Sequence, residues 1–434
     1  PSWDLAQPFR TLAHNGEINT LKGNINWMKI HEQDMSSSLF KNVKDLKPVI
    51  RSTSDSGALD NVFELLVHSG KLAPLIKLMM IPDAWSKRSK TVPKNHQDLF
   101  NFLNSTIEPW DGPAAICATD AKWVLASSDR NGLRPLRYTI TSDNLFFAGS
   151  ESGMIKIPEE NIIEKGKLGP GQIIAIDLKK GKLFKDKEIK DFLAKDYKKY
   201  SKQIIDLEKK ISHESEKPNF IKEELRKRQY LSGLSVEDLE LILHPMAEEG
   251  KEASGSMGDD TPVAVLSSHF RPVSHYFRQN FSQVTNPPID SLRENKVMSL
   301  KTRFGNLGNI LDFDNLTEEN IYVLDSPILT NSQFKKFKKF FSKKTKTIDC
   351  TFNISSSLKE RIEEIREEAE TSVRQGSTCI VLSDKNITDQ NASIPSILTV
   401  GAVHSHLVKH GLRGYCSLNV ECSDALDTHS FAVL

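Results

Sequence analysis

The chain reads Phe9-Arg-Thr-Leu-Ala-His-Asn-Gly-Glu-Ile18 close to its beginning. Leu12 and Ala13 suit a buried strand, and Asn15-Gly16 then predicts a turn in which a side-chain amide and a backbone N–H point the same way. Two such donors form an oxyanion hole, which stabilises the oxygen that gains charge during acyl transfer. Asn-Gly is also the strongest short signal for a β-hairpin, so the residues alone leave that structural interpretation open.

A second polar segment follows at Arg51-Ser-Thr-Ser-Asp-Ser56, ahead of a helix that apolar spacing predicts over Asp60–Ser69. A carboxylate such as that of Asp55 can hold the α-amino group of an amino-acid substrate. An acid near a helix N-terminus can equally satisfy backbone N–H groups there. The residues therefore leave both roles open for Asp55.

Short apolar runs alternate with polar turns over residues 1–190, which predicts an antiparallel sheet mixed with helices. Lysine and glutamate dominate residues 191–238, where Ile204, Leu207 and Ile211 recur at helical spacing. We therefore expect an amphipathic helix there, as a connector between two domains. The strands expected in the first domain are Ala114–Thr119, Trp123–Ala126, Asn144–Ala148 and Gln172–Asp177.

The second domain is expected over residues 239–434, with the alternation of helices and strands that is typical of an α/β fold. Its clearest unit is a helix over Ser357–Gln375, which begins on a serine and leads through Gly376 into a strand. The segment His429–Leu434 predicts a further strand. The other strands expected in this domain are Pro262–Leu266, Asn320–Leu324, Lys346–Cys350 and Thr378–Ser383.

The bulk composition argues against several classes of protein. With 434 residues, of which 38% are hydrophobic and 26% charged, the chain suits two or three compact domains. The formal net charge of +1 argues against a nucleic-acid binder, and no apolar run is long enough to span a membrane. The five cysteines include no C-x-x-C pair, so we expect free thiols in a reducing compartment and neither a structural zinc nor a disulfide framework.

Taken together, the segments Leu12–Ile18 and Ser54–Ser56 resemble the class II glutamine amidotransferases, whose domain belongs to the N-terminal-nucleophile hydrolases. The resemblance implies an α+β fold for the first domain, as part of an αββα sandwich. It also implies that Asn15 and Gly16 form the oxyanion hole and that Asp55 binds the α-amino group of glutamine. Gly16 would in addition help to hold glutamine through its backbone.

Further motifs select one family among these amidotransferases. The whole chain resembles glutamate synthase, and the later motifs fall in the central domain of that family. No signature of a phosphoribosyltransferase or an ATP pyrophosphatase follows the first domain, which argues against the other amidotransferases. The matching segments are Trp3–Phe9, Gly23–Trp27, Asp129–Pro135, Pro245–Glu248, Gly255–Pro262, Gln283–Asp290 and Gly401–His406.

The resemblance implies a reaction in two steps. An N-terminal cysteine attacks the side-chain amide of glutamine, with its own amine as the base, and ammonia is released. Ammonia then passes through a tunnel to a barrel that binds FMN, where it adds to 2-oxoglutarate and the imine is reduced to glutamate. The family also carries a 3Fe-4S cluster and receives electrons from a small subunit or from ferredoxin, in the cytoplasm or in a plastid.

The resemblance places several parts of this machinery outside the 434 residues. The cysteine nucleophile and the arginine that binds the substrate carboxylate are expected upstream of Pro1, and the FMN barrel and the cluster beyond Leu434. We therefore expect the chain by itself to bind no cofactor and to leave glutamine intact. The alternative is a non-catalytic module that keeps the amidotransferase fold as a binding or scaffold domain.

Two other clusters have plainer explanations. The H-x-H-x-x-x-H motif at His404–His410 imitates a zinc ligand set, but no carboxylate or cysteine completes it at a short spacing. We therefore expect no metal there. Asp129, Arg130 and Arg134 are expected to form an ion-pair cluster that fixes a turn between strands, in preference to a catalytic group.

The segment Val284-Thr-Asn-Pro-Pro288 predicts a rigid, extended loop, because its two prolines fix the backbone. In the glutamate synthase family this segment lies near the route of ammonia. Thr285 and Asn286 are therefore candidates for the wall of the tunnel, and a rigid packing loop is the alternative.

Overall fold

The computed structural model describes residues 9–51, 54–84, 92–195, 204–215, 221–252, 262, 264–268, 270–278, 292, 294, 298–312 and 321–434. Thr285 and Asn286, the two candidates for the tunnel wall, lie outside the described residues. Among the described residues, no helix has the length and apolar character needed to cross a membrane.

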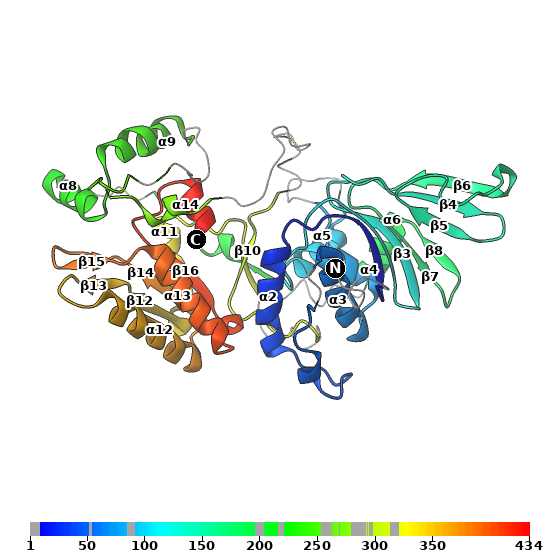
Figure 1. The fold of residues 1–434 in the computed structure, drawn as a ribbon, viewed down its shortest axis with the longest axis horizontal. Helices are drawn as coiled ribbons and strands as arrows, with labels where there is room; N and C mark the ends of the chain where they lie inside the picture. Colours follow the sequence, from blue (N-terminus) through cyan, green and yellow to red (C-terminus); the bar gives the residue numbers. More distant parts are fainter. Residues whose placement is uncertain are drawn as a thin grey trace. The chain divides into compact units, whose positions relative to one another are not determined.

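The chain forms two compact units, each drawn as a ribbon in Figure 1. The first unit consists of Pro1–Lys209, Pro288–Arg303 and Leu307–Pro327. The second unit consists of Lys210–Pro287, Phe304–Asn306 and Ile328–Leu434.

A five-stranded antiparallel sheet is the centre of the first unit. Its strand order is β1-β2-β3-β7-β8, so β1 lies at one edge of the described sheet. Three of the four strands expected in this domain, those at residues 114, 123 and 172, are confirmed here. The strands are β1 Leu12–Gly16, β2 Ala114–Thr119, β3 Trp123–Ser128, β7 Ile173–Asp177 and β8 Lys182–Phe184.

The two faces of this sheet are buried against different partners. Alternate residues of a strand point to opposite faces. Ile116 and Ala118 accordingly lie in the main core with the helices, whereas Ala115 packs with Phe146 of a second sheet. That sheet is antiparallel with the order β5-β4-β6, and β5 confirms the expected strand near Asn144. Its strands are β4 Arg137–Thr141, β5 Phe146–Gly149 and β6 Ile162–Lys167.

The helix α3, Asp55–His68, carries one of the candidate site residues. The side chain of Ser54 accepts a hydrogen bond from the N–H of Gly57 and thereby caps the helix. Gly70, with a φ of 89°, follows the end of the helix. The helix expected over Asp60–Ser69 is therefore confirmed, but it begins earlier. The other helices of this unit are α2 Leu21–Asp34, α4 Ala73–Met80, α5 Lys94–Leu103 and α6 Asp186–Ala194.

The amphipathic helix expected around Ile204 is wrong. Ile204–Asp206 form the strand β9, which pairs in parallel with β11, Ile321–Leu324. Leu207 begins a single 3₁₀ turn, and both Leu207 and Ile211 are 0% exposed. β-Branched residues favour a strand when a partner strand is present. That partner lies more than 100 residues away, so local spacing could not reveal it.

The second unit contains three parallel strands in the order β12-β14-β16. The helix α12 connects the first two strands, and α13 connects the last two. Because such connections are right-handed and the strands are added in one direction, both helices cover the same face of the sheet, as Figure 1 shows. The bounds are β12 Thr345–Asp349, α12 Leu358–Arg374, β14 Cys379–Ser383, α13 Ser396–Lys409 and β16 Ser417–Glu421.

The helix expected over Ser357–Gln375 is confirmed as α12, and the strands expected near Lys346 and Thr378 are confirmed as β12 and β14. The strand expected over Pro262–Leu266 is wrong, because Val265 and Leu266 lie in a turn and are 87% and 99% exposed. The remaining elements are α8 Lys222–Leu231, α9 His244–Glu249, β10 Thr302–Phe304, α11 Asn331–Phe340, β13 Thr351–Asn353 and β15 Asn391–Ser393.

The strand expected at His429–Leu434 is also wrong. These residues form most of the helix α14, Thr428–Val433. The carboxylate of Asp427 accepts a hydrogen bond of 2.7 Å from the N–H of Ser430 and caps this helix. The capping residue therefore decides the structure of a segment whose apolar side chains suit a strand equally well.

The first unit contains a buried amine at Lys77 on α4, whose residue exposure is 1%. Within the described residues its Nζ has no hydrogen-bond partner, and burial lowers the pKa of Lys77 to about 8. Nζ of Lys190, by contrast, lies 2.6 Å from Asp83 and 2.7 Å from Asp186. Burial of an ammonium group is costly unless a partner compensates it. Lys77 therefore destabilises the folded unit, whereas Lys190 is compensated.

We expect Lys77→Met to raise the free energy of unfolding of the first unit at pH 7 by up to about 3 kcal/mol. The pKa of this amine rises from about 8 in the folded chain to 10.5 in the unfolded chain. The penalty is therefore complete below pH 8 and is lost as the pH rises past 10.5, where the variant and the wild type should converge.

Urea unfolding at pH 7 and at pH 10 measures this difference. All five tryptophans lie between residues 3 and 123, so tryptophan fluorescence reports on the first unit. Lys190→Met is the matched control, and it should lower the stability because Asp83 and Asp186 lose their partner. A Lys77→Met variant that is less stable than the wild type at pH 7 would contradict the prediction.

Candidate functional site

Asn15 and Gly16 are the last two residues of β1, so the turn and the hairpin that Asn-Gly suggests are both wrong. Gly16 lies opposite Ala114 on β2. The N–H of Glu17 donates to the carbonyl of Pro113 at 2.9 Å, and hydrogen-bonded pairs alternate along an antiparallel ladder. Gly16 therefore occupies a non-bonded position, and its N–H points away from β2 toward the edge of the sheet.

The side chain of Asn15 supplies the second predicted donor. Asn15 is exposed, and its Nδ2 donates to the hydroxyl of Ser150 at 3.0 Å. The amide of Asn15 and the N–H of Gly16 belong to consecutive residues at the end of an edge strand. This is an accessible place for two donors that must meet an incoming carbonyl oxygen.

Gly16 cannot carry a side chain in this structure. A Cβ atom at this position would lie 1.9 Å from the carbonyl oxygen of Pro113 and 2.8 Å from Nε2 of His14. Both distances are far below van der Waals contact. The close approach of β1 to the segment before β2 therefore requires glycine.

Asp55 is the first residue of α3, and its Oδ2 accepts a hydrogen bond of 2.9 Å from the N–H of Ile18. The N-cap of the helix is Ser54, so this bond of Asp55 serves a different part of the chain. Ile18 lies two residues beyond Gly16. The bond thus brings the two polar segments of the sequence together at one place, next to the end of β1.

His14 and Ser56 add a second link between β1 and α3. Nδ1 of His14 lies 2.7 Å from the hydroxyl of Ser56. Burial lowers the pKa of His14, against the opposing effect of the Asp55 carboxylate, so the imidazole is neutral at pH 7. Both residues lie within the two polar segments, but neither has a role that the sequence pattern predicts.

Asp60, one turn and a half along α3 from Asp55, holds the beginning of β1. Its residue exposure is 3%. Its carboxylate accepts hydrogen bonds from the N–H groups of Arg10, Thr11 and Leu12 at 3.2, 2.9 and 3.1 Å. The hydroxyl of Thr11 donates to the same carboxylate at 2.7 Å. One helix therefore carries both the candidate substrate anchor and the group that positions the candidate oxyanion strand.

The ion-pair cluster expected for Asp129, Arg130 and Arg134 is wrong. The carboxylate of Asp129, which is 1% exposed, accepts backbone N–H groups from Ala114 and from its own turn. Arg130 instead pairs with Asp111, and Arg134 is exposed. A buried carboxylate at the end of a strand is satisfied most readily by the backbone around it. Asp129 thus fixes Ala114, the residue opposite Gly16.

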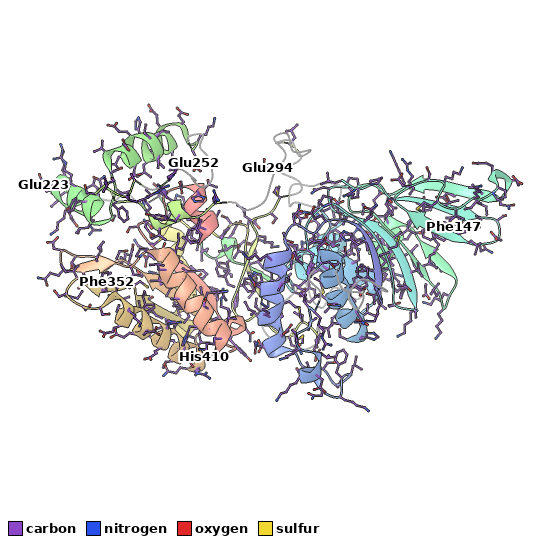
Figure 2. The ribbon with its side chains drawn as sticks, viewed as in Figure 1. Phe147, Glu223, Glu252, Glu294, Phe352 and His410 are labelled. Atoms are coloured by element: carbon purple, nitrogen blue, oxygen red, sulfur yellow. The ribbon has the colours of Figure 1, made fainter. Side chains whose placement is uncertain are left out.

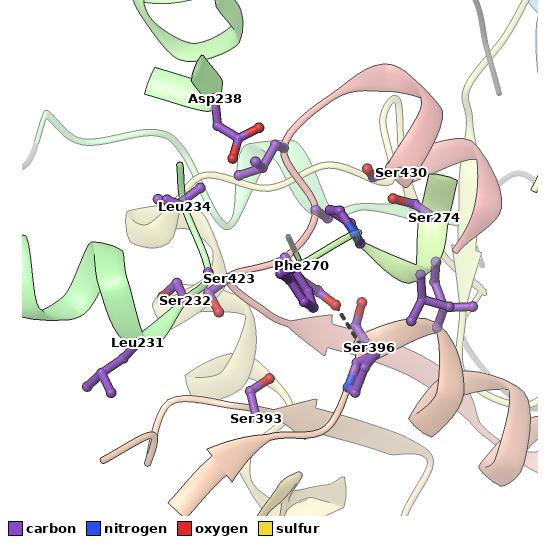
Figure 3. Close-up of a pocket in the computed structure, with 18 of the residues that line it drawn as sticks. Leu231, Ser232, Leu234, Asp238, Phe270, Ser274, Ser393, Ser396, Ser423 and Ser430 are labelled. Atoms are coloured by element: carbon purple, nitrogen blue, oxygen red, sulfur yellow. Dashed lines mark hydrogen bonds between the residues drawn. The ribbon is translucent and has the colours of Figure 1, made fainter. Parts of the chain in front are cut away.

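The second unit has a cavity of about 290 Å³, which Figure 3 shows in close-up. Ser396 at the start of α13 and Ser423 after β16 contribute to it, near the ends of strands where wound sheets often bind ligands. Phe270 and Leu234 add apolar surface. The lining mixes hydroxyl groups, the carboxylates of Asp238 and Asp424 and apolar side chains, so it indicates no particular class of ligand. The serines that line it are Ser232, Ser274, Ser393, Ser396, Ser423 and Ser430.

Comparison with known families assigns a relative to each part of the chain. The family described as Glutamine amidotransferases class-II matches residues 1–202, which include Asn15, Gly16 and Asp55. The family described as Glutamate synthase central domain matches residues 227–434. Residues 1–202 therefore belong to the class II glutamine amidotransferases, and residues 227–434 belong to the central-domain family of glutamate synthase. The amidotransferase motifs and the later motifs that resemble glutamate synthase lie in the two matched domains.

Relatives with known names cover the whole chain. The large chain of an NADPH glutamate synthase from Azospirillum brasilense is 53% identical, and that from Bacillus subtilis is 39% identical. A chloroplastic ferredoxin-dependent glutamate synthase from Arabidopsis thaliana is 38% identical. Each alignment covers 100% of this chain but only 29%, 29% and 27% of the relatives. The names include NADPH and ferredoxin, so the similarity selects no electron donor for this chain.

Proposed function

We propose that this chain supplies the glutamine-binding and oxyanion-stabilising part of a glutamate synthase. The observation that supports the proposal is the hydrogen bond between Asp55 and the N–H of Ile18, two residues after Gly16, which links the two polar segments. In the proposed reaction, glutamine is hydrolysed to glutamate and ammonia. Ammonia then reaches a flavin site, where 2-oxoglutarate is reductively aminated to a second glutamate.

The residues of this chain act on the first step. The amide carbon of glutamine is attacked by a cysteine thiolate, and its oxygen gains negative charge. The N–H of Gly16 and the amide of Asn15 donate hydrogen bonds to that oxygen. Asn15 gives up its neutral bond to Ser150 for a stronger, charge-assisted bond in the transition state. Asp55 holds the α-ammonium group of the substrate, and the backbone of Gly16 also contacts glutamine.

The cysteines of this chain do not fit an iron–sulfur cluster, which requires thiolate ligands. Burial raises the pKa of Cys350 and Cys422 to about 12, and that of Cys379 and Cys416 to about 11. Burial therefore opposes the thiolate form that a cluster ligand must take. We propose that the 3Fe-4S cluster and FMN are held by other parts of a full-length synthase, as the resemblance implies.

We propose a complete αββα sandwich of the N-terminal-nucleophile type, to which the described residues contribute helices and two sheets. The domain limits 1–190, 191–238 and 239–434 and the tunnel role of Thr285 and Asn286 also stay predictions. A small subunit or ferredoxin would supply electrons, in the cytoplasm or in a plastid. The nucleophilic cysteine would come from a preceding part of the enzyme.

Asp55→Asn in the full-length synthase tests the proposed function. We expect the KM for glutamine to rise about 10- to 100-fold, because the charge that holds the α-ammonium group is lost. Asparagine keeps an oxygen that can accept the N–H of Ile18, so the contact between the two segments survives. Glutamate synthesis from added ammonia should continue. Steady-state rates with glutamine and with ammonia give both numbers.

Asp45→Asn is the matched control, since Asp45 is exposed in the 3₁₀ turn Val43–Leu46 and its carboxylate accepts a hydrogen bond from Asn42. It should leave both reactions unchanged. An unaltered KM for glutamine in Asp55→Asn removes Asp55 from the substrate site. A wild-type enzyme without glutaminase activity would favour the non-catalytic module instead.

A further inference from the structure

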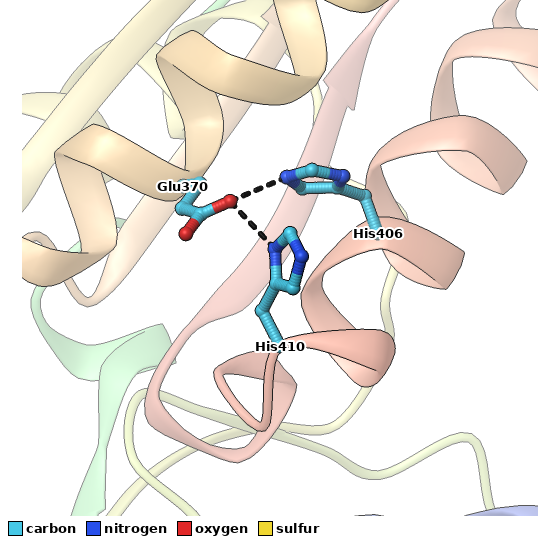
Figure 4. A group of neighbouring side chains, drawn as sticks. All are labelled: Glu370, His406 and His410. Atoms are coloured by element: carbon cyan, nitrogen blue, oxygen red, sulfur yellow. Dashed lines mark hydrogen bonds and ion pairs between the residues drawn. The ribbon is translucent and has the colours of Figure 1, made fainter.

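Three side chains of metal-ligating type meet between α12 and α13 of the second unit. Oε2 of Glu370, on α12, lies 2.6 Å from Nε2 of His406 and 2.6 Å from Nδ1 of His410 (Figure 4). His410 caps the end of α13, where Figure 2 labels it. The ligand atoms of the three residues all lie within 4.8 Å of one another.

The sheet topology brings these residues together. Because α12 and α13 cover the same face of the sheet, a side chain of one helix can contact the other. His406 and His410 are four residues apart and share a face of α13. His404 does not join them, because its Nδ1 accepts a hydrogen bond of 3.1 Å from Nε of Arg413. The absence of a metal was expected for want of a nearby carboxylate, and Glu370 supplies that carboxylate from the preceding helix.

We propose that Glu370, His406 and His410 form a zinc site, with water as the fourth ligand. Two imidazole nitrogens and a carboxylate oxygen are a common donor set for Zn²⁺. In a tetrahedron with bonds near 2.0 Å, the ligand atoms lie roughly 3.3 Å apart. Each nitrogen–oxygen separation of 2.6 Å would therefore open by about 0.7 Å, which small side-chain rotations can provide.

The surroundings of Glu370 suit this role. Arg374 donates from Nε and Nη2 to Oε1 of Glu370, each at 2.8 Å. That pair orients the carboxylate and leaves Oε2 directed at the histidines. The side chains of His406 and His410 are 13% and 34% exposed, which leaves an entry path for an ion.

A bound ion would join the two helices and stabilise the second unit. Zn²⁺ binds the neutral imidazole, so protons and Zn²⁺ compete for the two histidines. Without the ion, both histidines contact the same oxygen, Oε2 of Glu370. The ion would replace these two contacts, because it would bind Nε2 of His406, Nδ1 of His410 and Oε2 of Glu370.

Metal titration of the full, untagged chain tests the site. After treatment with a chelator, we expect the wild type to take up one Zn²⁺ in competition with a chromogenic chelator. Glu370→Gln and His410→Ala should each weaken binding at least about 10- to 100-fold, which is the loss that even an outer-shell partner causes. His404→Gln is the matched control and should bind like the wild type. Circular dichroism without metal checks that each variant is folded.

A second measurement needs no variant. Zn²⁺ should protect His406 and His410 from acylation by diethyl pyrocarbonate, with the modified residues mapped by mass spectrometry. The exposed His68 and His244 should react at the same rate with and without Zn²⁺. The proposal is overturned if the wild type binds no Zn²⁺, if His404→Gln loses as much affinity as His410→Ala, or if Zn²⁺ leaves the reactivity of both site histidines unchanged.

Discussion

Replacement of Asn15 by alanine in the full-length synthase is expected to lower kcat for glutamine hydrolysis about 100- to 1000-fold. The amide of Asn15 lies at the end of an edge strand, beside the N–H of Gly16. In the transition state both groups donate to an oxygen that carries negative charge. The variant keeps the N–H of Gly16 but loses the amide of Asn15, so the rate of the chemical step decreases. Ammonia release at saturating glutamine measures it.

Asn19→Ala is the matched control for this prediction. The hydrogen bond recorded for Asn19 uses its backbone N–H, which donates to Asp111 and survives the change. Its kcat should stay within about twofold of the wild type, as expected for a change at an exposed surface position. A kcat for Asn15→Ala that matches the value for Asn19→Ala would contradict the role of Asn15.

The second large effect concerns stability. Asp60→Ala is expected to lower the free energy of unfolding of the first unit by about 3 kcal/mol or more. The change leaves the N–H groups of Arg10, Thr11 and Leu12 and the hydroxyl of Thr11 without their acceptor. Each unsatisfied buried donor costs about 1–3 kcal/mol, although water entering the cavity recovers part of that cost. Urea unfolding followed by tryptophan fluorescence measures the change.

Glu64→Ala is the matched control on the same helix. The carboxylate of Glu64 pairs with the side chain of Arg10, which is 65% exposed, at 2.7 Å. An exposed pair of this kind contributes less than about 1 kcal/mol. Similar unfolding midpoints for the two variants would show that Asp60 does not position β1. Asp60→Asn, which retains one acceptor oxygen, should fall between the two.

Elements that depend on local signals could be predicted from the sequence. The helix α12 begins after a capping serine, Ser357, and shows a regular apolar stripe. Gly376, with a φ of 95°, follows its end. The helix α3 begins at Asp55, five residues before the expected start, because its capping residue is Ser54. Local capping was the stronger signal in that case.

Elements that depend on distant partners could not be predicted. Ile204 becomes part of a strand only because β11 lies beside it, and the apolar spacing around it imitates a helix. The same limit applies to the site. Asn15, Gly16 and Asp55 were identified through resemblance to a family, whereas Asp60 acts on residues that lie 48 to 50 positions earlier. No spacing rule links positions so far apart.

The carboxylates of the first unit show how much of the site depends on such contacts. Asp60 holds the beginning of β1, and Asp129 holds the N–H of Ala114 opposite Gly16. Both side chains are almost fully buried, with 3% and 1% exposure. Each accepts backbone N–H groups on one of the two paired strands. The candidate oxyanion strand and its partner strand are therefore each held by a buried carboxylate.

We propose that the end of β1 stabilises the transition state while Asp55 anchors the substrate. The most direct measurement is the comparison of kcat and KM for glutamine in Asn15→Ala and Asp55→Asn, with ammonia-dependent synthesis measured in the same preparations. We predict that Asn15→Ala lowers mainly kcat, that Asp55→Asn raises mainly KM, and that both keep the ammonia-dependent rate. Variants that change the same parameter, or that lose the ammonia-dependent rate as well, would contradict this division of roles.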